Sequence, residues 1–164
     1  MKKNIILISL IILFGLLTRF IPHPPNFTPI IAMVLFGSVY LENKKLAILI
    51  PLTIMILSDY FLGYGFLSLW VYGSLGLISL LGYLTKKLNI INMLLGSVIF
   101  FIVTNFGVWL MGYPKTLDGF ILCYTLAIPF FANTLLSTII YSFVFNFMYR
   151  SIRNIQFIKV NDNS

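Results

Sequence analysis

Apolar residues fill this chain in long runs, and short polar groups separate the runs at regular intervals. A helix needs roughly 20 predominantly apolar residues to cross the hydrocarbon core of a bilayer. The pattern predicts such helices at about residues 4–20, 28–40, 46–61, 69–84, 91–112 and 129–149. The last apolar run begins near residue 116, and because Pro129 lacks an amide donor we expect it to split off 116–128 as a partial-depth segment. The chain is therefore predicted to be an all-α, integral membrane bundle of six transmembrane helices.

The most polar interruption is residues 19–29, which read Arg-Phe-Ile-Pro-His-Pro-Pro-Asn-Phe-Thr-Pro. Its prolines remove amide donors and disfavour helix in the residues before them, so no uninterrupted helix can run through it. The helix that follows, with Thr28 as N-cap and Pro29 at its first position, would be only about 18 to 20 Å long and would start inside the membrane. Non-helical backbone at membrane depth is tolerated where it lines a wet cavity or is buried in protein. We interpret this stretch as one wall of a small-molecule site.

Composition excludes an ordinary soluble domain. The 164 residues are 60% hydrophobic and 9% charged, with a mean hydropathy of +1.01, whereas about a quarter of the residues of a soluble domain are charged. We expect residues 1–150 to form a single transmembrane domain and residues 151–164 to form a polar, frayed cytoplasmic tail. No small-x-small cleavage site follows the first apolar run, so we interpret that run as a retained span rather than a signal peptide.

The net charge of +7 is explained by topology rather than by nucleic-acid binding, because the basic residues lie in small groups between the apolar runs. With six spans, one side of the membrane holds Lys2, Lys3, Lys44, Lys45, Lys86, Lys87, Arg150, Arg153 and Lys159. The other side holds only Arg19 and Lys115. Cytoplasmic loops carry the excess of lysine and arginine. Both termini are therefore predicted to be cytoplasmic in a multi-pass protein of the bacterial plasma membrane, with the unusual polar residues in the outer half.

Arg19 and Asp59 are the ionisable residues predicted to lie at membrane level, where each would cost about 2.5 to 3.5 kcal/mol at a helix centre. Residues of this kind are usually paired or functional. Two interpretations stay open from the sequence. Arg19 and Asp59 either pair or line a site, or both lie at the interface, where they snorkel or cap.

Polar and aromatic residues of the later spans suit a small polar or aromatic ligand. Asn105 and Trp109 are four residues apart and so share one helix face, and Asn133 lies at a similar depth in the last span. Amides donate and accept hydrogen bonds and an indole offers a stacking face, although interhelical amide bonds are the alternative. Tyr113 opens the outer loop, which either covers a site or belongs to an aromatic belt. The predicted substrate-binding residues are Arg19, Asn26, Asp59, Asn105, Trp109, Tyr113 and Asn133.

Motifs of common enzymes are missing from the sequence. It contains no His-Glu-x-x-His, no Gly-x-Ser-x-Gly and no phosphate loop, and it has four acidic residues in total. Cys123 is the single cysteine, which excludes a disulfide framework or a cysteine metal site within the chain. We expect no catalytic residues, no metal and no cofactor, and we interpret His23 as a loop residue.

Several motifs, taken in order along the chain, carry a resemblance to a known family. They are Arg19, Pro24-Pro25-Asn26-Phe27-Thr28-Pro29, Pro51 with Ser58-Asp59, Thr104-Asn105-Phe106-Gly107-Val108-Trp109, and Cys123-Tyr124 with Pro129-Phe130-Phe131-Ala132-Asn133-Thr134. The order resembles a family of small uncharacterised bacterial membrane proteins, carried as a domain of unknown function and labelled as transport proteins. By size and span number such proteins resemble the S components of energy-coupling-factor vitamin importers.

This resemblance implies a substrate-binding subunit that captures a small vitamin-like molecule from outside and then docks against a transmembrane coupling subunit driven by ATPases. S components dock through small residues on their first helix, whereas Ser9 and Gly15 here are six residues apart and lack the small-xxx-small spacing. The alternatives are a stand-alone carrier or channel, a non-transport membrane assembly subunit and a lipid-modifying enzyme. The partners expected from the sequence are the lipid bilayer, a small-molecule ligand and the coupling subunit.

Overall fold

A computed structural model describes residues 2–41, 43–63, 65 and 67–161, and no strand occurs among them. The elements are α1 (Lys2–Leu17), the 3-10 turn η1 (Thr18–Phe20), α2 (Ile30–Tyr40), α3 (Lys44–Leu62), α4 (Ser68–Thr85), α5 (Ile90–Gly112) and α6 (Leu117–Asn161). The all-α prediction is confirmed. The predicted spans at 69–84 and 91–112 agree with α4 and α5 to within one residue at each end.

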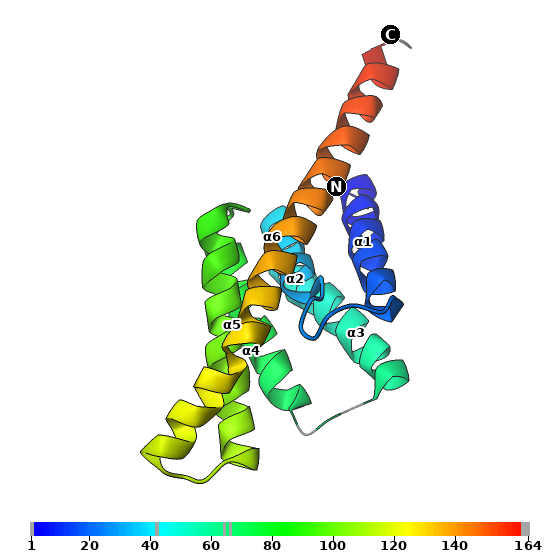
Figure 1. Ribbon diagram of the computed structural model, residues 1–164. Helices are drawn as coiled ribbons and strands as arrows, with labels where there is room; N and C mark the ends of the chain where they lie inside the picture. The colour runs from blue at the N-terminus through cyan, green and yellow to red at the C-terminus, as the bar shows by residue number, and fades with distance from the viewer. Residues whose placement is uncertain (1, 42, 64, 66, 162–164) are drawn as a thin grey trace.

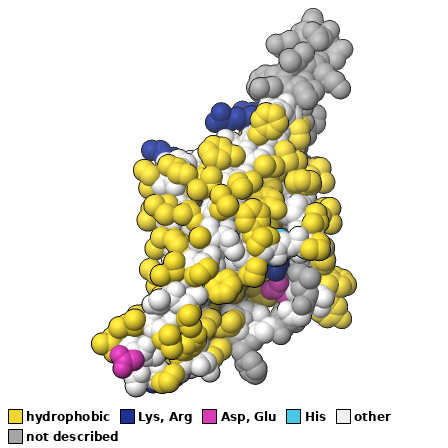
Figure 2. Space-filling model, in the orientation of Figure 1, with side chains coloured by type: hydrophobic (Ala, Val, Ile, Leu, Met, Phe, Trp, Pro, Cys, Tyr) yellow, Lys and Arg dark blue, Asp and Glu magenta, His cyan; other side chains and the backbone are white. Residues whose placement is uncertain are grey.

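Helices α4, α5 and α6 carry the features of membrane-crossing helices. Ser68–Thr85, Ile90–Gly112 and Leu117–Arg153 are long and apolar enough to cross a bilayer, and Ile6–Phe20 and Ile30–Tyr40 are shorter apolar helices. Large apolar side chains point outward, Leu69 being 80% exposed and Phe147 73% exposed. Figure 2 shows hydrophobic side chains covering much of the face in view. A surface this apolar indicates that the protein is associated with a membrane.

Helix α2 is the centre of the bundle. Every residue from Ile30 to Ser38 is buried, and α2 packs against α1, α3, α4, α5 and α6 (Figure 1). A helix that is apolar on all sides is stable only when other helices surround it. On one side Phe36 stacks among the rings of Tyr40, Phe145 and Tyr149, and on the other Leu35 packs with residues of α3, α4 and α5.

The central helix is also the shortest. At 1.5 Å per residue the 11 residues of α2 span about 16 Å, while the 23 residues of α5 span about 35 Å. The longer helices around α2 therefore extend past its first residue, Ile30. The non-helical residues 21–29 occupy that end of the bundle, and they leave space there that side chains do not fill completely.

Helices approach closely where glycine replaces a larger side chain. A Cβ atom on Gly15 would lie 2.6 Å from Cζ of Phe145, and one on Gly107 would meet the indole ring of Trp70. Gly82 likewise brings α4 against Ser38 of α2. These contacts hold α1 to α6, α5 to α4 and α4 to α2.

The structure corrects the prediction that Pro129 splits the last apolar run, because α6 continues through it. Proline removes one backbone hydrogen bond, which bends a helix without ending it when both flanking segments are held in place. The first half of α6 is held against α5, where the Tyr124 hydroxyl donates to the carbonyl of Ile102 and the rings of Phe101 and Phe131 pack together. Residues 151–161, expected to be frayed, continue α6.

A smaller correction concerns the start of α2. The N-cap is Pro29 rather than Thr28, and no side chain caps this end. Figure 1 places both termini toward one end of the bundle and the α5–α6 loop at the other, with residues 21–29 between them.

Candidate functional site: a cavity at the end of the central helix

Residues 21–29 form an ordered turn against α6. The amide of Phe27 donates to the carbonyl of Pro24 at 3.0 Å, and Asn26 has a φ of 61°. Proline followed by asparagine at positive φ fits the centre of a type II turn, because asparagine tolerates the left-handed region. The Nδ2 of Asn133 donates to the carbonyl of Pro25 at 3.0 Å. The predicted non-helical segment is confirmed, and α6 fixes its position.

An ion pair stands beside this turn. Nη2 of Arg19, in η1, lies 2.9 Å from Oδ1 of Asp59 on α3, and the two side chains are only 11% and 12% exposed. The hydroxyl of Tyr72 on α4 donates to the other carboxylate oxygen at 2.7 Å. Arg19 also donates to the hydroxyl of Ser58 and contacts the sulfur of Met55. Of the two interpretations that the sequence left open, the structure shows the pair, which together with Tyr72 joins η1, α3 and α4.

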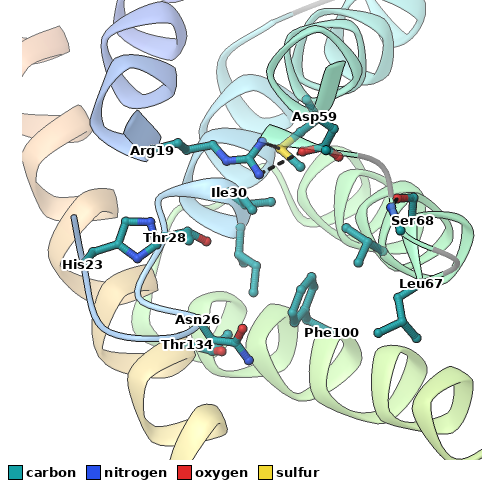
Figure 3. A pocket seen from close by; sticks show the side chains of 15 residues that line it. Arg19, His23, Asn26, Thr28, Ile30, Asp59, Leu67, Ser68, Phe100 and Thr134 are labelled. Carbon is teal, nitrogen blue, oxygen red and sulfur yellow. Dashed lines mark hydrogen bonds and ion pairs between the residues drawn. The ribbon is translucent and has the colours of Figure 1, made fainter. Parts of the chain in front are cut away.

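The ion pair forms part of the wall of a cavity of about 350 Å³ (Figure 3). Its polar lining includes Arg19, His23, Asn26, Thr28, Asp59 and Ser68. Its apolar lining includes Ile30 and Ile31 at the start of α2, with Leu67, Val71 and Phe100. The volume lies in the range of about 300 to 1,000 Å³ that is usual for small-molecule sites, and the mixture of apolar walls with a few polar groups is also typical.

A second cavity, of about 340 Å³, lies next to the first, and the two share the lining residues Asn26, Leu67, Val71 and Phe100. Asn105, Val108 and Tyr113 come from α5 and its end, and Cys123, Ala127 and Phe130 come from α6. No lysine, arginine, aspartate or glutamate lines this second cavity among the described residues. The two spaces therefore differ in chemistry, the first containing an ion pair and the second being apolar with a few uncharged polar groups.

The sequence matches the family of unknown function DUF6580 over residues 1–158. The chain belongs to this family. No curated protein and no solved structure matches it. The expected membership of an uncharacterised family is confirmed, whereas the resemblance to S components stays a prediction.

In this DUF6580 protein, five of the seven predicted site residues line the two cavities. Arg19 and Asp59 line the first, Asn105 and Tyr113 line the second, and Asn26 lines both. The Nδ2 of Asn105 donates to the carbonyl of Phe101 in its own helix at 2.8 Å. This bond differs from the interhelical amide bond considered as the alternative.

Trp109 and Asn133 line neither cavity. The indole N–H of Trp109 donates to the carbonyl of Pro114 at 3.1 Å, and Nζ of Lys115 donates to the carbonyls of Trp109 and Tyr113. Trp109 thus holds the loop that follows α5, and Asn133 holds the turn at Pro25. Both residues therefore hold the backbone of a loop or turn beside the cavities.

Sequence reasoning missed the apolar lining and one polar contact. Leu67, Val71 and Phe100 are indistinguishable in sequence from the exposed apolar residues around them. The bond of Tyr72 to Asp59 depends on how α3 and α4 pack, which the sequence alone does not give. No group of three or more His, Cys, Asp or Glu side chains able to hold a metal ion occurs in the described part of the chain. The arrangement is suited to holding a small molecule by shape and hydrogen bonds.

Proposed function

We propose that this DUF6580 protein is a six-span protein of the bacterial plasma membrane that captures a small, water-soluble, vitamin-like molecule from outside, as the substrate-binding subunit of a transport system. The observation that carries the proposal is the cavity at the end of α2, built around the Arg19–Asp59 pair. An ion pair largely removed from water beside a cavity of ligand size is what a polar solute needs in order to bind at membrane depth.

Charge distribution supports an outward-facing cavity. Lys45 lies in the first turn of α3, and Lys86 and Lys87 lie in the α4–α5 connection. The cavity is lined by the opposite ends of the same two helices, through Asp59 of α3 and Ser68 of α4. Figure 1 shows the α4–α5 connection toward the end that carries both termini and the α5–α6 loop at the opposite end. The positive-inside rule assigns the lysine-rich end to the cytoplasm. With that orientation both termini are cytoplasmic and the Arg19–Asp59 cavity faces the outer side.

Transport of the captured molecule would draw energy from a partner, a transmembrane coupling subunit with ATPases, because the sequence carries no phosphate loop. Docking of the S-component kind gains no support from α1. Gly15 is buried against Phe145 and Met33 inside the bundle, so it does not offer a small-residue surface to another helix.

A second candidate function is a non-transport assembly subunit, and one observation on α4 favours it. Cβ atoms added at Gly73 and Gly76 would have nothing within 4 Å, so this face of α4 has room for a close helix–helix contact. An assembly subunit would copurify with a stoichiometric protein partner and without a small molecule.

Native mass spectrometry of the full-length protein, purified in mild detergent, tests the proposal. We expect a sharp added mass of a few hundred daltons on the wild type. Val71→Trp places a large ring where the two cavities meet and should abolish the added mass, whereas Leu77→Trp changes an exposed position of the same helix and should retain it. A bare wild type that stays bare after incubation with a vitamin and metabolite mixture would overturn capture and favour the assembly subunit.

A further inference from the structure

The two cavities share lining residues and can therefore be treated as two parts of one groove. Four residues line both, and they come from three parts of the chain, namely Asn26 from the turn, Leu67 and Val71 from the start of α4, and Phe100 from α5. Figure 3 shows Asn26, Leu67 and Phe100 around one side of the first cavity, away from Arg19 and Asp59. A molecule longer than the first cavity would therefore extend past Phe100 into the second.

The chemistry of the groove changes along its length. The ionised lining residues of the first cavity are Arg19 and Asp59, and the second has none among its described lining residues. Beyond Phe100 the walls are largely apolar and include Val108, Leu126, Ala127 and Phe130. Such an asymmetric groove fits a molecule with a polar head and an apolar arm, because each end then meets walls of its own polarity.

The charge balance of the groove restricts the head. Arg19 and Asp59 lie 2.9 Å apart and neutralise each other, and with His23 neutral the formal charge of the described lining is zero. A ligand with a net charge would bring an uncompensated charge to membrane depth, which is costly. An uncharged or zwitterionic head avoids this cost and still finds donors and acceptors at Arg19, Asn26 and Thr28.

From these observations, and resting on the proposed function, we infer that the ligand class is amphipathic molecules of zero net charge. The polar head binds beside the Arg19–Asp59 pair, and the apolar arm extends past Phe100 into the second cavity beside Cys123. Because Arg19 and Asp59 neutralise each other, the head is recognised as a net-neutral group rather than through an opposite charge. Cys123, the single cysteine of the chain, lines the second cavity and is only 2% exposed, so an arm that fills this cavity should slow the access of a reagent to the thiol.

The test measures the rate at which N-ethylmaleimide alkylates Cys123 in the full-length protein. The alkylated product is detected by its added mass in mass spectra of the intact protein. Four probes share an indole arm and differ in head charge: indole-3-acetamide is uncharged, tryptophan is zwitterionic, indole-3-acetate is anionic and tryptamine is cationic. Acetamide supplies a head without an arm. We expect the two net-neutral indoles to slow alkylation, by roughly ten-fold at about ten times their dissociation constant. The two charged indoles and acetamide should leave the rate unchanged.

Thr28→Trp tests whether the cavities form one groove, because Thr28 lines the first cavity and not the second. Protection of Cys123 should be lost in Thr28→Trp and retained in Leu77→Trp. Protection by the charged indoles, protection that survives Thr28→Trp, or no protection by either net-neutral indole would each overturn the inference. The native mass spectrometry of the purified wild type uses none of these probes. The presence or absence of an added mass in those spectra therefore shows separately whether capture itself fails.

Discussion

At the scale of single residues, the Arg19–Asp59 pair combines two largely buried charges that would each be costly alone. Three further contacts surround it, from Tyr72, Ser58 and Met55. A buried pair of this kind contributes little net stability when both members are replaced together, but removing one member leaves the other charge unpaired. The pair therefore holds this part of the cavity wall in place, and it also supplies the charged groups of the wall.

Asp59→Asn should therefore destabilise the protein more than the double change Arg19→Gln with Asp59→Asn. We expect the single change to cost about 3 kcal/mol, because it leaves the guanidinium without its counter-charge, and the double change to cost clearly less. Thermal loss of the monomer peak in detergent measures the difference. Equal losses for the single and double variants would show that the two residues contribute independently.

Asn105→Ala should weaken ligand binding and leave folding nearly intact. The side-chain amide donates within its own helix and lines the second cavity, so its removal leaves the side-chain hydrogen bonds between the described parts of different helices intact. The added mass in native spectra and the thermal stability of the monomer are the two measurements. Asn133→Ala is the contrasting variant, because it releases the turn at Pro25 and should increase hydrogen exchange in residues 21–28. A collapse of the Asn105→Ala monomer would instead identify a structural residue.

At the scale of elements, the short α2 decides where the cavities form. Surrounding helices are longer, and the prolines of residues 21–29 prevent α2 from extending to fill the bundle at that end. Close glycine contacts keep the neighbouring helices in place around it. Gly107 beside Trp70 is a contact of this kind between α5 and α4, near the walls of both cavities.

Gly107→Ala should destabilise the bundle by about 1 to 3 kcal/mol, because the new methyl group meets the Trp70 ring and forces the helices apart. Gly76→Ala is the matched control, since a Cβ atom there has nothing within 4 Å and alanine favours helix over glycine. Melting in detergent should fall for the first variant and stay level or rise for the second. A stable Gly107→Ala protein would mean that Trp70 repacks without cost.

At the scale of the whole molecule, the proposed orientation places the cavity on the outer side of the membrane. In a Cys123→Ser background, Asp118→Cys lies at the start of α6 and Lys87→Cys lies between α4 and α5. We expect a membrane-impermeant maleimide to label the first in intact cells and the second only after lysis, because cytoplasmic loops carry the excess of positive charge. The reverse pattern would place the cavity toward the cytoplasm and exclude capture from outside.

Much of the architecture follows from the sequence because apolar run length and proline act locally. The extents of α4 and α5, the break at residues 21–29 and the shortness of α2 were all predictable, since each depends on neighbouring residues alone. The prediction at Pro129 was wrong because the outcome there does not depend on neighbouring residues alone. Whether a proline ends a helix or only bends it depends on the contacts that hold the flanking turns, and those contacts, such as Tyr124 with Ile102, join different helices.

The sequence by itself determined the class of this protein: an all-helical, strongly apolar chain with a polar, proline-rich interruption after its first helix. It also singled out Arg19, Asn26, Asp59, Asn105 and Tyr113, because polar residues are costly in apolar surroundings and so stand out. Only the tertiary structure decided that Arg19 pairs with Asp59, that Trp109 and Asn133 support loops, and that Leu67, Val71 and Phe100 line the cavities. Those outcomes depend on helix packing between residues far apart in the chain, which no local pattern encodes.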